Sequence, residues 1–343
     1  MMTTTFLRPL GTALLGLGLA TQAAAVDVTG AGATFPAPIY AKWAEGYKSA
    51  HGSTINYQAI GSGGGVKQIK AKTVDFGASD DPVPGEELTK DGLVQFPAVI
   101  GGIVPIINVQ GIGPGGLILD APTVAAIYAG TITEWNDEAI AKLNPGVKLP
   151  EQAISPIYRS DSSGTTAAFT NYLAAVVPSF KDEVGAGKTV DWPVGMGGKG
   201  NAGVAANVGK VAGSIGYVEY AYAKQNKLAH AKFVNKAGKT VEPDYKSFAA
   251  AARGADWNSA PGMGVALHNQ ADPEAWPMTS ASFILMQKSD LGKTEKSAEA
   301  LKFFRWALKE GGKQAIEMDY VPIPETVVPL IEKNLKEAGA PAP

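Results

Sequence analysis

Residues 158–169 read Tyr158-Arg159-Ser160-Asp161-Ser162-Ser163-Gly164-Thr165-Thr166-Ala167-Ala168-Phe169. This pattern predicts a strand over 155–159, a tight polar turn, and a helix that runs to about residue 177. A helix start exposes unpaired N–H groups and the positive end of the helix dipole, so it attracts anions. Hydroxyl groups surround this start, beside the guanidinium of Arg159 and the carboxylate of Asp161. The segment predicts either an anion-binding turn or an ordinary capped helix, because serine, threonine and aspartate also favour N-caps for local reasons.

Three further strand ends carry polar groups toward the start of a helix or turn. The glycine-rich turn 30–35 precedes a helix with Pro36 in its first turn, which places Thr34 at the expected N-cap. The turn 61–65 places Ser62 at the mouth of the next helix, and a third strand, 74–78, leads to Asp80. Ligands of open α/β sheets bind beyond the carboxyl ends of the strands. We therefore expect these turns to form one site with residues 158–169.

Composition excludes several classes of function. The chain has 343 residues, of which 45% are hydrophobic and 18% charged, and this is enough for two globular domains. A net charge of −2 gives no electrostatic reason to expect nucleic acid or an anionic membrane as a partner. Without cysteine, the chain has no disulfide, thiol nucleophile or thiolate metal site.

Residues 1–25 have the features of a secretory signal peptide. Arg8 precedes an apolar run over 10–20, and Ala23 and Ala25 fit the small-residue cleavage pattern. The run is too short to span a bilayer, so we expect cleavage, export and no membrane insertion.

Short apolar runs alternate with helical segments in the remaining chain, which predicts α/β layers. Two apolar runs, 93–99 and 103–109, flank Gly101 and Gly102, where we expect the chain to enter a second domain. A short strand is expected over 189–192, and a last strand and two helices are expected to return to the first domain. The predicted division is domain I over 26–99 plus 271–343 and domain II over 100–270.

Enzymatic alternatives have weaker support. Residues 195–200 match G-x-G-x-x-G, but Pro193 and export argue against a dinucleotide site, so we interpret them as a structural or cleft-lining loop. An exported phosphomonoesterase that uses Ser62 or Ser163 as nucleophile remains the competing hypothesis. It lacks an evident base, because none of the three histidines lies in a serine-rich turn, and their spacing predicts no metal site.

The turns together resemble those of the periplasmic phosphate-binding proteins, the substrate-binding components of phosphate-specific ABC importers. The resemblance rests on residues 30–38, 61–65, 74–80 and 159–165, and continues through 192–193, 215–220 and 275–277. It implies a two-domain periplasmic binding protein of type II-like fold, with the ligand in the interdomain cleft. It also implies a periplasmic, cofactor-free monomer that is not an enzyme and that delivers phosphate to the membrane subunits of the importer.

The resemblance also implies the ligand-binding residues. These are Thr34, Phe35, Ser62, Asp80, Arg159, Ser163, Gly164 and Thr165, with Asp161 supporting Arg159. Two residues depart from the family pattern: Gly63 replaces a second serine, and Ser162 stands where glycine is common. Ser162 would restrict the loop if its φ had to be positive.

Asp80 is the residue that we expect to set selectivity. A carboxylate in an anion site fits a ligand that brings a proton, and phosphate near neutral pH carries at least one P–OH group. Sulfate has none and would oppose Asp80 acceptor to acceptor. We further expect phosphate to close the cleft by a hinge motion.

Overall fold

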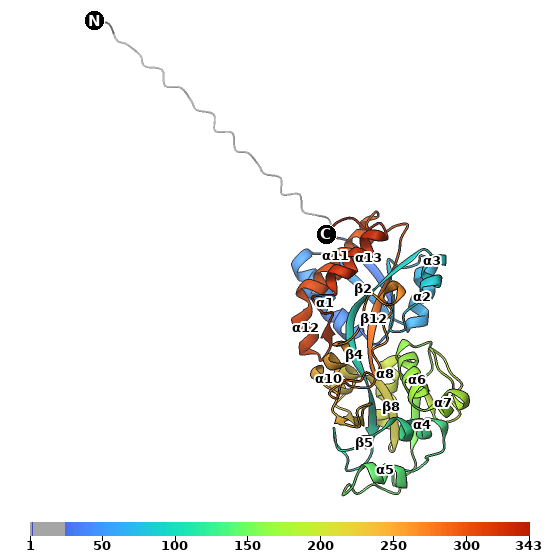
Figure 1. The fold of residues 1–343 in the computed structure, drawn as a ribbon. Helices are drawn as coiled ribbons and strands as arrows, with labels where there is room; N and C mark the ends of the chain where they lie inside the picture. Colours follow the sequence, from blue (N-terminus) through green and yellow to red (C-terminus); the bar gives the residue numbers. More distant parts are fainter. Residues whose placement is uncertain (1, 3–24) are drawn as a thin grey trace.

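The computed structural model describes residues 25–343 together with Met2, so the expected signal peptide, residues 1–25, lies almost wholly outside the described residues. The fold is α/β, and Figure 1 shows two lobes joined by long strands that run between them. One sheet continues through both lobes in the order β2-β1-β3-β12-β4-β8-β6-β7. The two-domain α/β architecture expected from the sequence is therefore confirmed.

The first lobe is built on three parallel strands and the strand that returns from the end of the chain. The parallel strands are β1 (Asp27–Gly32), β2 (Thr54–Ala59) and β3 (Phe76–Ser79), and β12 (Thr279–Gln287) lies antiparallel to β3. The helices of this lobe are α1 (Ala37–His51), α2 (Ser62–Lys70), α3 (Gly85–Lys90), α11 (Glu295–Glu310), α12 (Gly312–Glu317) and α13 (Val328–Glu337). The last two long helices thus lie against the first lobe, as the sequence predicts.

The second lobe continues the sheet with β8 (Ser214–Glu219), β6 (Ser155–Arg159) and β7 (Met196–Gly198). A separate small sheet contains β5 (Ile118–Leu119), β10 (Lys232–Val234) and β11 (Thr240–Val241). The helices are α4 (Ala121–Ala129), α5 (Glu138–Leu143), α6 (Gly164–Val176), α7 (Pro178–Glu183), α8 (Gly200–Lys210), α9 (Tyr220–Gln225) and α10 (Tyr245–Ala252). The short strands β9 (Ala229–His230) and β13 (Val321–Pro322) both pair with β4.

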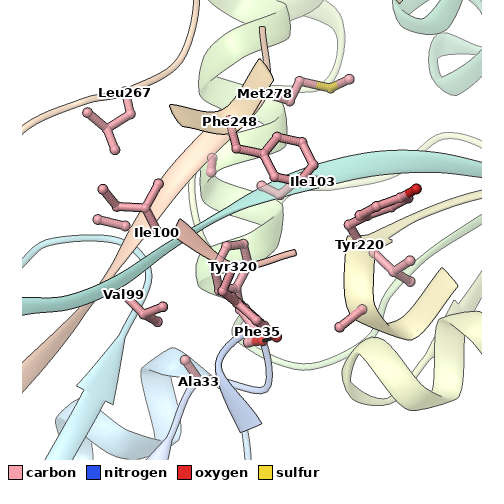
Figure 2. Close-up of a cluster of buried hydrophobic side chains, with 14 of the residues drawn as sticks. Ala33, Phe35, Val99, Ile100, Ile103, Tyr220, Phe248, Leu267, Met278 and Tyr320 are labelled. Atoms are coloured by element: carbon pink, nitrogen blue, oxygen red, sulfur yellow. Dashed lines mark hydrogen bonds between the residues drawn. The ribbon is translucent and has the colours of Figure 1, made fainter. Parts of the chain in front are cut away.

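Strand β4 (Leu93–Asn108) connects the lobes. The two apolar runs expected here form one continuous strand, because Gly101 and Gly102 stay in the ladder. Its first part pairs with β12 as far as Gly102, and its second part pairs with β8 from Ile103 onward. Figure 2 shows Phe35, Phe248 and Tyr320 packed around this crossing, which is fully buried.

Two local expectations are wrong. Residues 189–192 form no strand, and the N-cap of α1 is Pro36, which leaves the Thr34 side chain for other partners. Within the described part of the chain, no helix has the length and apolar character needed to cross a membrane.

Candidate functional site

Four strand ends meet between the lobes, and Ser62 connects three of the segments that follow them. The Ser62 Oγ atom accepts hydrogen bonds from the N–H of Gly164 at 3.0 Å and the N–H of Asp80 at 3.2 Å. It also lies 3.4 Å from Asp80 Oδ2. The start of α2, the end of β3 and the start of α6 are therefore held around one hydroxyl group. Residues 62, 80 and 164 come together as the sequence predicts.

Arg159 is fixed by Asp161, the partner expected for it. Its Nε and Nη2 atoms donate to the two carboxylate oxygens at 2.8 and 2.6 Å, and its side chain is 1% exposed. The N–H of Gly200 donates to the same carboxylate at 2.9 Å. Burial opposes ionisation of Asp161, but the bonds from Arg159 and Gly200 outweigh it and lower its pKa. The pair therefore holds a positive guanidinium whose charge is largely balanced.

Several buried polar atoms at this site have no partner of hydrogen-bond geometry among the described residues. They include the Nη1 atom of Arg159, the Oδ1 atom of Asp80 and the hydroxyl of Ser282, which lies beside Asp80. Burial raises the pKa of Asp80 from 3.8 to about 7, although the hydroxyls of Ser282 and Ser62 and the charge of Arg159 act in the opposite direction. Buried polar atoms are nearly always paired in proteins, so such an unpaired set points to a ligand.

Asn201 is a site residue that the sequence analysis missed. Its backbone N–H and its Nδ2 atom donate to Thr34 Oγ1 at 3.1 and 2.7 Å, and Nδ2 also lies 3.3 Å from Thr165 Oγ1. Its Oδ1 atom accepts from the N–H of Glu219. The available signal was its position directly after the glycine loop 195–200, at the start of α8. The glycine loop 195–200 therefore lines the site, which agrees with its interpretation as a cleft-lining loop.

The start of α6 has the capped geometry predicted from the sequence. Ser163 is the N-cap, and its Oγ atom accepts from the N–H of Thr166 at 3.0 Å. The N–H of Gly164 donates to Ser62, which joins the start of α6 to the start of α2 in the first lobe. The Thr165 side chain is fully buried beside Asn201. Ser163 therefore caps the helix, and the residues that follow it contact the other segments of the site.

Three successive carbonyl groups before α1 are each bound by a tyrosine hydroxyl. The hydroxyls of Tyr57, Tyr222 and Tyr320 donate to the carbonyl oxygens of residues 33, 34 and 35 at 2.7, 2.6 and 2.7 Å. In a trans peptide the C=O and N–H groups point in opposite directions. Holding these carbonyls therefore orients the following N–H groups, including that of Phe35, away from the tyrosines. The Phe35 ring is buried against Tyr320 and Gly101 and serves packing (Figure 2).

Gly63 and Ser162, the two residues that depart from the family pattern, contact each other. A Cβ atom on Gly63 would lie 2.2 Å from Ser162 Oγ, which is far inside contact distance. The N–H of Gly63 donates to the Ser162 carbonyl at 3.1 Å, so the backbones are also joined. Ser162 does not adopt a positive φ, so it places no strain on the loop. The serine side chain occupies the space that a side chain at position 63 would need.

The geometry gives no support for nucleophilic catalysis. In residues 25–343, no histidine hydrogen-bonds to Ser62 or Ser163. The same part of the chain contains no cluster of histidine, aspartate and glutamate that could hold a metal ion. The site consists mainly of neutral donors, one balanced guanidinium and one carboxylate.

A family model described as a PBP superfamily domain matches residues 19–310. The phosphate-binding protein PstS of Pasteurella multocida is 55% identical over 318 residues, which cover 93% of this chain and 92% of that protein. Its namesake in Haemophilus influenzae is 53% identical over 324 residues, covering 94% and 96%. This chain belongs to the PstS family. The family identified from the turns is thereby confirmed, and these PstS relatives are named as binding proteins, not enzymes.

A solved structure agrees with the PstS fold. The phosphate-binding protein from Stenotrophomonas maltophilia superposes with a TM-score of 0.67 at 20% identity, covering 90% of this chain and 93% of that one. At this identity the likeness shows the fold alone, and it confirms the binding-protein architecture.

Proposed function

We propose that this protein binds inorganic phosphate outside the cytoplasm and delivers it to an ABC importer. The observation that carries the proposal is the buried, unpaired pair of atoms Asp80 Oδ1 and Arg159 Nη1, surrounded by hydroxyl and amide groups. A tetrahedral anion that also carries a hydrogen matches this combination of donors and one acceptor. The PstS relatives are named for the same ligand.

The proposed ligand-binding residues come from both lobes. From the first lobe we assign Thr34, Phe35, Ser62 and Asp80, and from the second Arg159, Ser163, Gly164 and Thr165, with Asp161 as the support of Arg159. We add Asn201 as a second supporting residue, since it orients Thr34 and Thr165. Neutral donors replace the water shell of the anion, so the site needs no excess of lysine.

Asp80 gives the proposed selectivity for phosphate over sulfate. Phosphate keeps at least one P–OH near neutral pH and can donate it to Asp80 Oδ1. Sulfate has no hydrogen to donate, so ionised Asp80 would repel it. A site that requires a hydrogen bond from its ligand rejects an analogue without it by about 10⁴–10⁵-fold.

The proposed working cycle uses the two lobes. We assign residues 26–99 plus 271–343 to domain I and residues 100–270 to domain II, which close on phosphate as a hinge. The bonds between Thr34 and Asn201 and between Ser62 and Gly164 cross this boundary, so they correspond to the closed state. We propose a periplasmic monomer that presents the closed form to the membrane subunits.

Calorimetry tests the function. Protein stripped of ligand is titrated with phosphate and with sulfate at pH 8, and turnover of a generic phosphate monoester is assayed in parallel. We expect tight, saturable phosphate binding, sulfate binding weaker by several orders of magnitude, and no turnover. Absence of phosphate binding would overturn the proposal, whereas ester turnover lost on Ser62→Ala would favour the phosphomonoesterase.

A further inference from the structure

A buried chain of three oxygen atoms connects the lobes beside the proposed site. Glu219 ends β8 in the second lobe, Tyr320 precedes β13, and Phe35 lies in the loop before α1. The Tyr320 hydroxyl oxygen is 2.6 Å from Glu219 Oε2 and 2.7 Å from the Phe35 carbonyl oxygen. All three residues are 0% exposed, and Figure 2 shows Tyr320 directly against Phe35.

Counting hydrogens assigns a proton to this chain. A tyrosine hydroxyl carries one hydrogen, and a carbonyl oxygen carries none. The 2.7 Å contact with Phe35 therefore takes the hydrogen of Tyr320, so the hydrogen in the 2.6 Å contact must come from Glu219. An ionised Glu219 would instead accept the hydrogen of Tyr320. The Tyr320 and Phe35 oxygens would then lie 2.7 Å apart with no hydrogen between them.

The surroundings of Glu219 favour its neutral form. Its carboxyl oxygens otherwise accept only from the N–H of Ala221, at 3.0 Å each, and it forms no salt bridge within the described residues. The ionisable groups that interact with it are Tyr222, Tyr320, Asp80 and Asp319, and the cations next to these groups are Arg159, which acts on Tyr222, and Lys224, which pairs with Asp319. Arg159 and Lys224 are each paired with another carboxylate. Burial, aided by the charges of Asp319 and Asp80, raises the pKa of Glu219 from 4.5 to about 8.

We propose that Glu219 is a positioning residue that acts as a neutral carboxylic acid, donates its hydrogen to Tyr320 and so locks the Phe35 loop across the closed lobes. The consequence for phosphate rests on the proposed function, since Phe35 belongs to the proposed ligand set. Opening separates Glu219 from Tyr320 and exposes it, which lowers its pKa. Closing then takes up a proton, and affinity falls as pH rises toward about 8 and levels off above.

Replacing Glu219 with glutamine, which has nearly the same shape, shows whether the residue acts by donating a hydrogen or by carrying a negative charge. In Glu219→Gln the amide N–H donates to Tyr320 and the amide oxygen accepts from Ala221 without any proton uptake on closing, so phosphate affinity at pH 6.5 should equal or exceed that of wild type. Glu219→Ala removes the donor and should weaken binding about tenfold or more. The ratio of wild-type to Glu219→Gln affinity should fall between pH 6.5 and 8, and Glu151→Gln, an exposed control, should leave the wild-type pH profile unchanged.

Infrared spectroscopy of the closed, phosphate-saturated protein reads the proton directly. The phosphate-saturated wild-type protein at pH 6.5 should show the C=O stretch of one protonated carboxyl group that Glu219→Gln lacks and that disappears above about pH 8. A Glu219→Gln protein that fails to fold or binds more than tenfold more weakly at pH 6.5, or the absence of this band difference, overturns the inference. Failure of wild type to bind phosphate would instead overturn the proposed function, whereas normal phosphate binding without this band would overturn the assignment of the proton to Glu219 alone.

Discussion

The carboxyl group of Asp80 changes its hydrogen-bonding role near physiological pH. Its pKa is raised by burial to about 7, so it is an acceptor above that pH and a donor below it. Protonated Asp80 can donate to sulfate, whereas ionised Asp80 repels it. We expect sulfate affinity to rise about tenfold per pH unit as pH falls from 9 to 7 and to level off below 7.

Competition titrations of sulfate from pH 9 to 5 check this expectation. Asp182→Asn, a change at an exposed aspartate, serves as the control and should keep the wild-type profile. Sulfate affinity that does not change with pH would rule out Asp80 as the group that excludes sulfate.

Gly63 and Ser162 form a matched pair, so their substitutions should not be additive. Gly63→Ser alone places a Cβ atom against Ser162 Oγ, and such overpacking typically costs about 1–3 kcal/mol. Gly63→Ser combined with Ser162→Gly removes the clash and should recover most of the lost stability and phosphate affinity. Thermal unfolding and calorimetry of the two single variants and the double variant measure the coupling. Purely additive effects would show that the two positions do not share space.

At the scale of elements, the loop before α1 depends on the tyrosine hydroxyls that hold its carbonyl groups. Tyr57→Phe removes the hydroxyl donor of the residue 33 carbonyl, and Tyr222→Phe leaves the residue 34 carbonyl with only the 3.3 Å bond from the N–H of Ala37, at a cost of up to about 1–3 kcal/mol each. We expect phosphate affinity to fall about tenfold in each variant because the following N–H groups lose their orientation. Tyr172→Phe is the matched control, since this buried tyrosine contacts Phe233 far from the loop. Equal affinities of all three variants would contradict the role assigned to the hydroxyls.

Local sequence predicted the elements whose signals are local. Strand β6 and the start of α6 follow from the alternation of apolar residues and the serine cap. The N-cap at Thr34 was wrong because Asn201, distant in sequence, binds that hydroxyl. Residues 189–192 have strand-like composition, but β7 takes the neighbouring place beside β6. Tertiary pairing decided both cases, and no local pattern encodes it.

The candidate site was predictable as a set of turns, but its internal bonds were not. Helix starts and strand ends place residues 34, 62, 80 and 159 at one edge, as the topology of open sheets requires. The contribution of Asn201 and the neutral Glu219 depends on burial and on partners more than 100 residues away. Such burial is a property of the assembled lobes.

At the scale of the whole molecule, a continuous strand and a set of polar contacts join the two lobes. β4 crosses from one lobe to the other at Gly102, and the ion pairs Asp81–Lys188 and Lys224–Asp319 lie across the boundary. We expect phosphate to reduce the radius of gyration in small-angle scattering by closing the cleft. Arg159→Ala should show no change on adding phosphate, because the ligand no longer joins the lobes. Identical wild-type scattering with and without phosphate would contradict hinge closure.

The most direct test of the account is the sulfate-to-phosphate affinity ratio of wild type and Asp80→Asn, measured by competition titration at pH 8. The asparagine has nearly the same shape but offers sulfate an N–H donor in place of a negative oxygen. We predict that wild type prefers phosphate by about 10⁴-fold or more and that the variant loses most of this preference. An unchanged ratio in Asp80→Asn would contradict the claim that one buried acceptor selects the ligand.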